Sequence, residues 1–150
     1  MTLQKLTPNV TVNDVLDSAR FWCEVLGFDF VVGVPEGTQD SVFELVERPL
    51  GFAIVQSDGI EIMFQSLESV QADLPNFRLP SEGDGATMLF IELDDVEAMR
   101  ERVGDRGDLV SDLRETFYGM REFVLRDPGG LVVVFAQRLA VADQDPGDAQ

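Results

Sequence analysis

The residues 118-YGMREFVLRDPGGLVVVFAQ-137 decide the fold of this chain. They predict two strands, Arg121–Arg126 and Leu131–Gln137. The tight turn Asp127–Gly130 joins them, since its proline presets φ and its glycines supply a positive φ. The Val and Phe run of the second strand is too apolar for a strand wetted on one face. We therefore expect a helix on one face of this hairpin and a core or a ligand cleft on the other.

The composition excludes several classes of function. The chain has 150 residues, enough for one domain or for two small halves that share a core. Its 28 acidic and 11 basic residues give a net charge of −17. Such a charge repels nucleic acids and anionic membranes and attracts a cationic ligand, although it also serves simply to hydrate the surface. No apolar run approaches the roughly 20 residues that cross a bilayer, and no secretory signal is visible.

The cysteine and histidine counts narrow the chemistry further. Cys23 is the sole cysteine, so no internal disulfide forms, and we expect a cytoplasmic protein. The chain has no histidine. This removes the commonest general base and the usual ligands of catalytic zinc or iron.

The first half begins with a strand, Leu3–Val12, followed by a helix. Asp14 is a suitable N-cap, apolar residues then recur at helical spacing, and Gly27 ends the helix. Short apolar runs bounded by Pro and Gly predict the strands Phe28–Val34, Ser41–Val46, Phe52–Gln56 and Ile60–Gln65.

The second half repeats the first. Asp95 opens the second helix 81 residues after Asp14, and Gly130 follows Gly59 by 71 residues. The first copy therefore carries about ten extra residues, which we place in the Val34–Gln39 loop. The other strands predicted for the second copy are Thr87–Leu93, Leu109–Val110 and Leu113–Tyr118.

These elements predict one domain with a repeated plan. Residues 1–66 form a first βαβββ module, 67–85 a linker with a short helix starting at Leu67, and 86–140 a second βαβββ module. Residues 141–150 are expected to be a disordered acidic tail.

Three stretches carry a resemblance to a known family: VNDVLDSARFWCEVLGF (Val12–Phe28), IELDDVEAMRERV (Ile91–Val103) and GMREFVLRDPGGLVVVF (Gly119–Phe135). In this order the chain resembles the vicinal oxygen chelate superfamily, which includes glyoxalase I, bleomycin-resistance proteins and extradiol dioxygenases. It looks most like the bleomycin-resistance branch. The resemblance implies an α+β fold of paired βαβββ modules, with curved mixed sheets and helices on the outside. It also implies a homodimer in which each cleft opens toward the dimer interface.

The resemblance further implies four positions where metal-dependent members carry metal ligands. Here these positions hold Thr7, Met63, Met88 and Val134. Two thioethers, a hydroxyl and an isopropyl group bind a hard or borderline divalent ion poorly. A two-residue shift in register would bring in Glu61, Gln65 or Glu92, which are still too few for a catalytic site. We therefore expect no metal and no cofactor.

The same positions become candidates for ligand binding. Tyr118 matches the place where the bleomycin-resistance branch stacks an aromatic ring on a planar ligand, with Phe30 or Phe43 as the second ring. Glu61 and Glu92 are weak candidates for a catalytic acid or base, and a solvated rim is their plainer interpretation. Arg121 and Glu122 are interpreted as a structural salt bridge or a dimer contact. The full candidate set for ligand binding is Thr7, Asn9, Thr11, Phe30, Phe43, Glu61, Met63, Met88, Tyr118 and Val134, with plain core or backbone hydrogen bonding as the alternative for the small and apolar members.

The sequence therefore predicts metal-independent binding of a small molecule that is flat, aromatic or cationic. The resemblance implies sequestration of a bleomycin-type antibiotic by a homodimer, with no nucleic acid or membrane partner. Two alternatives stay open. One is a glyoxalase-like lyase, isomerase or dioxygenase that uses a divalent metal or a lone carboxylate base. The other is a non-catalytic structural dimer whose cleft is filled by its own side chains.

Overall fold

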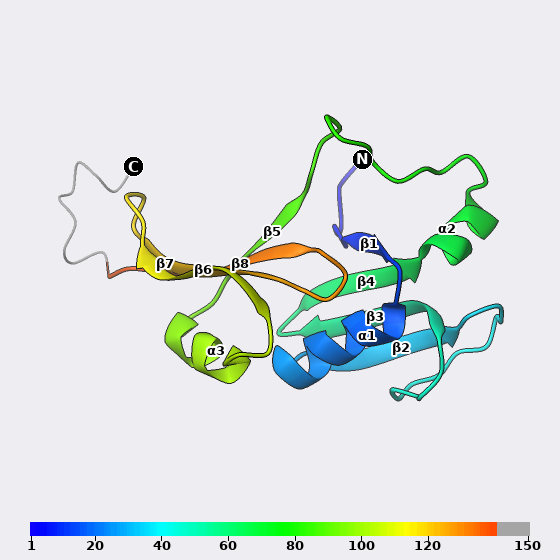
Figure 1. The fold of residues 1–150 in the computed structure, drawn as a ribbon, viewed down its shortest axis with the longest axis horizontal. Coiled ribbons are helices and arrows are strands. Elements are labelled where there is room, and N and C mark those ends of the chain that lie inside the picture. The colour runs from blue at the N-terminus through cyan, green and yellow to red at the C-terminus, as the bar shows by residue number, and fades with distance from the viewer. Residues whose placement is uncertain (141–150) are drawn as a thin grey trace. The chain divides into compact units, whose positions relative to one another are not determined.

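The computed structural model describes residues 1–140, which form two βαβββ repeats (Figure 1). The repeats are joined by a segment that contains a short helix, α2 (Leu67–Asp73). The first repeat consists of β1 (Asn9–Val12), α1 (Val15–Arg20) continued by the π-helical turn η1 (Phe21–Val25), β2 (Asp29–Pro35), β3 (Leu50–Ser57) and β4 (Ile60–Ser66). The second consists of β5 (Met88–Glu92), α3 (Val96–Val103), β6 (Asp108–Glu115), β7 (Met120–Arg126) and β8 (Val132–Arg138).

The two sheets have the same topology, which confirms the predicted repeat and the α+β fold class. Their strand orders are β1-β4-β3-β2 and β5-β8-β7-β6, and in each sheet only the first pair is parallel. Asn9 lies beside Met63 in the first sheet, and Phe90 lies beside Val134 in the second. These pairs keep the spacings of 81 and 71 residues. The equivalence of Met63 and Val134 is therefore confirmed by the strand register.

The first compact unit comprises Met1–Thr87 together with the turn Asp127–Leu131. Asp14 caps α1 by accepting a hydrogen bond from the Asp17 backbone N–H at 3.0 Å. α1 packs against β3 and β4 (Figure 1). Trp22 is fully buried there, edge-on to Phe28 with ring centroids 4.9 Å apart.

The turn Asp127–Leu131 is part of this first core, although it comes from the second repeat. The buried Asp127 carboxylate accepts hydrogen bonds from the indole N–H of Trp22 and from two backbone N–H groups of its own turn, each at 2.9 Å. Gly129 lies so close to Val12 that a Cβ there would come within 2.6 Å of Val12 Cγ1. The turn that fixes the second hairpin therefore also fastens it to the first unit.

The second compact unit comprises Met88–Arg126 and the chain from Val132 onward. α3 packs against β7 and β8, where Phe123 and Phe135 stack with centroids 5.4 Å apart. The Arg100 guanidinium lies 6.0 Å from the Phe123 ring centroid. One face of the predicted hairpin thus carries a helix, as expected from its apolar run.

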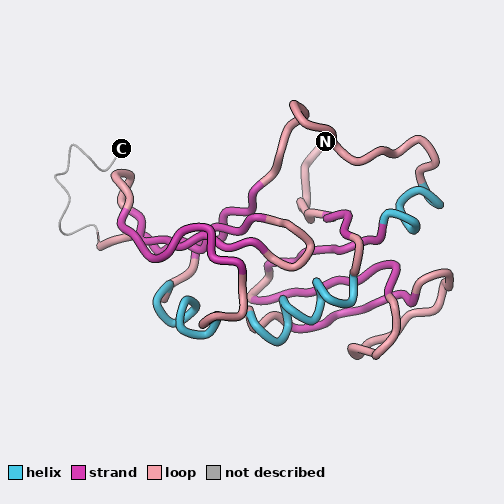
Figure 2. Tube along the Cα trace, viewed as in Figure 1, coloured by secondary structure: helices cyan, strands magenta, loops and turns pink. Residues whose placement is uncertain are grey.

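Four expectations need correction. Ser41–Val46 is not a strand: it belongs to the loop 36–49, which touches the sheet through a single bridge between Val42 and Gly33 (Figure 2). This loop is ten residues longer than the loop 116–119 of the second repeat, so the extra residues lie here and extend beyond Val34–Gln39. β1 begins at Asn9 because Pro8 has no N–H to donate, and its carbonyl accepts from Met63 instead.

The fourth correction concerns the second repeat. The two predicted strands Leu109–Val110 and Leu113–Tyr118 are one strand, β6, with irregular register on either side of Ser111. The predicted tail 141–150 lies outside the described residues. Among residues 1–140, no helix is long and apolar enough to cross a membrane.

Candidate functional site

The face of the second sheet opposite α3 carries the strongest candidate site, and we call it the second open face. Residues directly opposite each other on neighbouring strands share a face. Strand pairing therefore puts Glu122 with Ala136 and Arg114, and Val124 with Val134. The same face includes Met88, Phe90 and Glu92 of β5, and Met120 of β7.

This face has a buried apolar floor and an exposed apolar edge. Met120, Val134 and Ala136 form one cluster, with Val124 packed against it and none of the three more than 7% exposed. On β5, the side of Met88 and Phe90 is open, with 63% and 52% of these residues exposed. Water-exposed Met and Phe beside an apolar floor form a surface that a flat ligand can cover.

A buried carboxylate, Glu122, interrupts this floor. Its residue exposure is 2%, and Oε1 accepts two hydrogen bonds: from the Tyr118 hydroxyl at 2.9 Å and from Arg114 Nη2 at 3.1 Å. The hydrogen bond to Glu122 raises the pKa of Tyr118 above its ordinary value. Oε2 is buried and has no hydrogen-bond partner among the described residues. This is uncommon, because most buried polar atoms are paired.

The loop 116–119 positions Tyr118 over Glu122. Thr116 closes the loop, since its backbone N–H donates to the Met120 carbonyl at 2.8 Å and its hydroxyl accepts from the Met120 N–H at 3.1 Å. Gly119 has φ of +80°, which a residue with a side chain rarely adopts. Tyr118 is 49% exposed, and its ring stands edge-on to that of the fully exposed Phe117. An aromatic ring is thus presented to solvent beside a buried carboxylate.

The first sheet has a corresponding open face, opposite α1, with more polar residues. It carries Asn9 and Thr11 of β1 with Glu61, Met63 and Gln65 of β4. The Asn9 amide donates to Gln65 at 2.9 Å, and Glu61 pairs with Lys5 at 2.9 Å. Several of the predicted contact residues are therefore already satisfied within the chain.

The remaining candidates have different settings. Thr7 is half-buried and precedes β1. Phe30 pairs with the buried Val55, and its ring lies against Gly33 on the covered face, so it does not share a face with Met63. Phe43 is 71% exposed in the loop 36–49. Met88 and Val134 lie on the second open face, as described above.

The residues at the four implied metal positions do not fit a divalent metal. Val134 belongs to the apolar floor, and the two Met thioethers suit soft metals rather than hard ones. The substitutes offered by a register shift are engaged elsewhere: Glu61 with Lys5, and Glu92 with Arg138 at 3.0 Å. Across residues 1–140, no group of three or more His, Cys, Asp or Glu side chains is placed to hold a metal ion.

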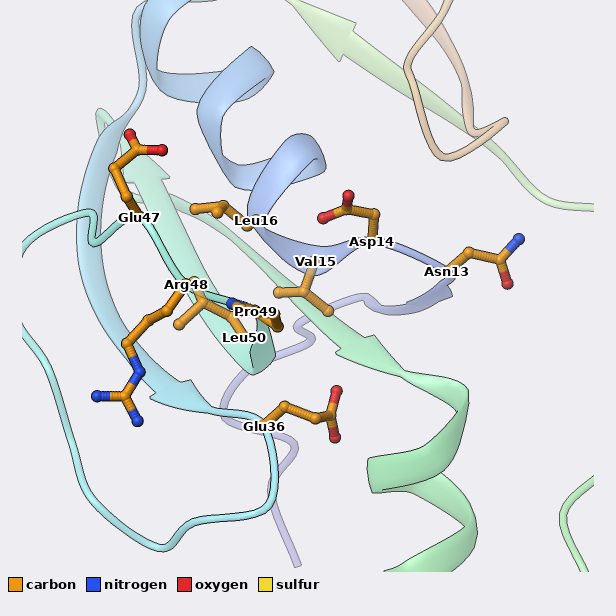
Figure 3. Close-up of a pocket in the computed structure, with 9 residues that line it drawn as sticks. All are labelled: Asn13, Asp14, Val15, Leu16, Glu36, Glu47, Arg48, Pro49 and Leu50. Atoms are coloured by element: carbon orange, nitrogen blue, oxygen red, sulfur yellow. The ribbon is translucent and has the colours of Figure 1, made fainter.

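A separate depression lies beside the start of α1 (Figure 3). Its cavity volume is about 380 Å³, and Val15 and Leu50 in its wall are almost fully buried. Glu47, on its rim, pairs with Arg20 at 2.7 Å. None of the predicted site residues lines it; its lining consists of Asn13, Asp14, Val15, Leu16, Glu36, Glu47, Arg48, Pro49 and Leu50.

Sequence reasoning interpreted Glu122 as part of a structural pair and so missed its place in the site. Only the alternation of β7 carried a signal, because Glu122 falls in step with Met120 and Val124 and opposite Phe123. The partner of Arg121 proves to be Glu97 of α3, at 3.0 Å on the helix side of the sheet. The two neighbouring charged residues therefore serve opposite faces.

The fold and the motifs agree with a family match. Residues 4–135 match the model of the Glyoxalase/Bleomycin resistance protein/Dioxygenase superfamily, and the chain belongs to this family. No protein among those of curated function matches the sequence significantly.

Solved structures share the fold at low sequence identity. TioX from Micromonospora sp. ML1 is 17% identical with a TM-score of 0.67, covering 91% of this chain and 99% of its own. A glyoxalase-related enzyme from Fulvimarina pelagi is 18% identical with a TM-score of 0.66, covering 91% and 89%. The bleomycin-binding protein of bleomycin-producing Streptomyces verticillus, solved with copper(II)-bleomycin, is 24% identical with a TM-score of 0.56, covering 90% and 96%. At these identities the likeness concerns the fold alone.

Proposed function

We propose that this protein binds a small, flat organic molecule on the second open face, without a metal ion of its own. The observation that carries the proposal is the combination on one sheet face of a buried apolar floor, exposed apolar side chains and the Tyr118–Glu122 hydrogen bond. Sites for small molecules are mostly apolar, with a few placed polar groups that fix orientation.

Each part of the face has a role in this binding. The Tyr118 ring stacks on a planar ligand, which is worth about 0.5–1.5 kcal/mol beyond the area it buries. Met88 and Met120 adapt to the outline of the ligand, because an unbranched thioether fills irregular gaps. The net charge of −17 raises the local concentration of a cationic ligand.

The ligand we propose is an antibiotic of the bleomycin type, held by a homodimer. Family membership and the fold shared with a bleomycin-binding protein support this choice. Asn9, Thr11 and Met63 on the first open face, with Thr7 and Phe43 near it, are proposed as further contacts. Phe30 leaves the proposal because its ring lies on the covered face.

Isothermal titration of the protein with metal-free bleomycin tests the proposal. We expect saturable heat at micromolar protein. Replacing Tyr118 with alanine should weaken binding about tenfold, because both stacking and buried area are lost. The matched control is Leu79→Ala, which truncates an exposed apolar residue away from the second open face and should leave the affinity unchanged. Absence of heat would remove bleomycin as the ligand, and equal losses in both variants would place binding elsewhere.

A further inference from the structure

We infer that Glu122 selects the ligand by accepting a hydrogen bond, on Oε2, from a neutral N–H group, and that the favoured ligands are aromatic molecules with a primary carboxamide. This inference rests on the proposed function, since it names the chemical class that the second open face takes. Glu122 thereby changes from a structural residue to the polar determinant of specificity.

The first argument is the uneven use of the carboxylate. Both donors, Tyr118 and Arg114, bind Oε1, whereas Oε2 has no partner among the described residues and is shielded from solvent. A carboxylate oxygen has room for about two hydrogen bonds, and leaving a buried acceptor unpaired is unfavourable. A ligand that brings a donor to Oε2 therefore recovers free energy that an apolar ligand of the same shape does not.

The second argument concerns charge. Arg114 already balances Glu122 through the 3.1 Å ion pair. A cationic group at Oε2 would lie near the Arg114 guanidinium, and like charges repel strongly where water is excluded. A neutral donor avoids this repulsion. The arrangement thus favours a neutral group at this point, although the acidic surface attracts a cation elsewhere on the ligand.

The third argument is that a carboxamide also offers an acceptor. The guanidinium of Arg114 has five N–H donors, of which Glu122 takes one, and the Arg114 side chain is 56% exposed. The amide carbonyl of a ligand would accept from Arg114 while the amide N–H donates to Oε2. An ester of the same shape keeps the acceptor and lacks the donor, so it separates the two contributions.

The route to Oε2 passes through side chains that are themselves exposed. Tyr118 stands in the loop 116–119 with 49% of its surface exposed, and Arg114 is on β6, which pairs only with β7. Exposed side chains change rotamer on the picosecond to nanosecond timescale. Displacement of Tyr118 toward solvent opens the floor at Met120 without breaking a strand pair.

The experiment uses the methionine methyl groups as reporters. The chain has five methionines: Met88 and Met120 lie on the second open face, Met63 on the first, Met99 on α3, and Met1 at the N-terminus. A protein labelled with [¹³C-methyl]methionine is titrated with benzamide, methyl benzoate and benzamidinium at high ionic strength, which screens the long-range field. We expect benzamide to shift Met88 and Met120 and to bind about tenfold more tightly than the other two compounds.

Two variants connect the preference to Glu122. Glu122→Gln removes the charge and one acceptor, so the benzamide preference should fall below about threefold. Tyr118→Phe removes only a donor that uses Oε1, so the preference should remain. An unchanged Met99 signal shows that each variant keeps its fold.

The outcomes distinguish the inference from the proposed function. Equal affinity for benzamide and methyl benzoate, with Met88 and Met120 shifted by both, would overturn the inference and leave the proposed function standing; a tightly held water on Oε2 would have this effect. Tighter binding of benzamidinium would also overturn it. Failure of all three compounds to shift Met88 or Met120 would contradict both.

Discussion

Replacing Asp127 with alanine tests how the second hairpin is fastened to the first unit. Its buried carboxylate holds the Trp22 indole N–H and two backbone N–H groups at 2.9 Å. The Trp22 N–H is fully buried, so leaving it unpaired costs about 1–3 kcal/mol. The two turn N–H groups are near solvent and lose about 0.5–1.5 kcal/mol each. Removal of a desolvated charge offsets part of this, so we expect a loss of about 3 kcal/mol.

Urea unfolding measures this loss directly, because Trp22 is the sole tryptophan and its fluorescence reports on its own surroundings. With a slope of about 2 kcal/mol per molar urea, the midpoint should fall by about 1.5 M. The control is Trp22→Phe, followed by circular dichroism, which removes the buried donor. In that background Asp127→Ala should cost about 1–2 kcal/mol less. A loss below about 1 kcal/mol in the wild-type background, or no coupling between the two residues, would refute the reasoning.

Three further predictions concern the same unit. Burial raises the folded-state pKa of Asp127, so the folded state takes up this proton at higher pH than the unfolded state. The stability of the wild type relative to Asp127→Asn should therefore increase as pH falls from 7 toward 3.8, as urea unfolding at several pH values will show; a relative decrease would contradict it. Gly129→Ala should cost about 1–3 kcal/mol, because its Cβ would meet Val12 at 2.6 Å, whereas Gly85→Ala, with open space around it, should be neutral in the same assay. Burial and nearby carboxylates raise the pKa of Cys23 to about 11, so only about 0.1% is thiolate at pH 8, and its reaction with a disulfide reagent should accelerate steadily up to that pKa; fast labelling at pH 7 would be inconsistent.

The fold was predictable because its signals are local and occur twice. Each repeat has an Asp N-cap, an apolar helical face and a glycine turn, and the matching spacings predicted which strands are equivalent. Ser41–Val46 was predicted wrongly because an apolar run predicts a strand only where a neighbouring strand can pair with it. Here the segment has one bridging residue, and the rest of the loop leaves the sheet.

The site was less predictable because it depends on contacts that sequence patterns do not encode. The Asp127–Trp22 hydrogen bond joins residues 105 positions apart. The burial of Glu122 depends on Arg114 beside it and on the return of Tyr118 through the loop 116–119, whereas a charged residue in a strand is ordinarily placed on a solvated face. The residue types at the implied metal positions, by contrast, were readable at once, since they need only the register.

The central claim is that the second open face binds a flat ligand without the metal chemistry of related folds. The most direct measurement is the methionine methyl spectrum recorded with metal-free bleomycin, first in excess chelator and then after addition of a divalent metal. The account predicts that Met88 and Met120 shift in the chelator and that the metal adds nothing to the affinity of the protein for this probe. Shifts of these two methyl groups that appear only after the metal is added would contradict it.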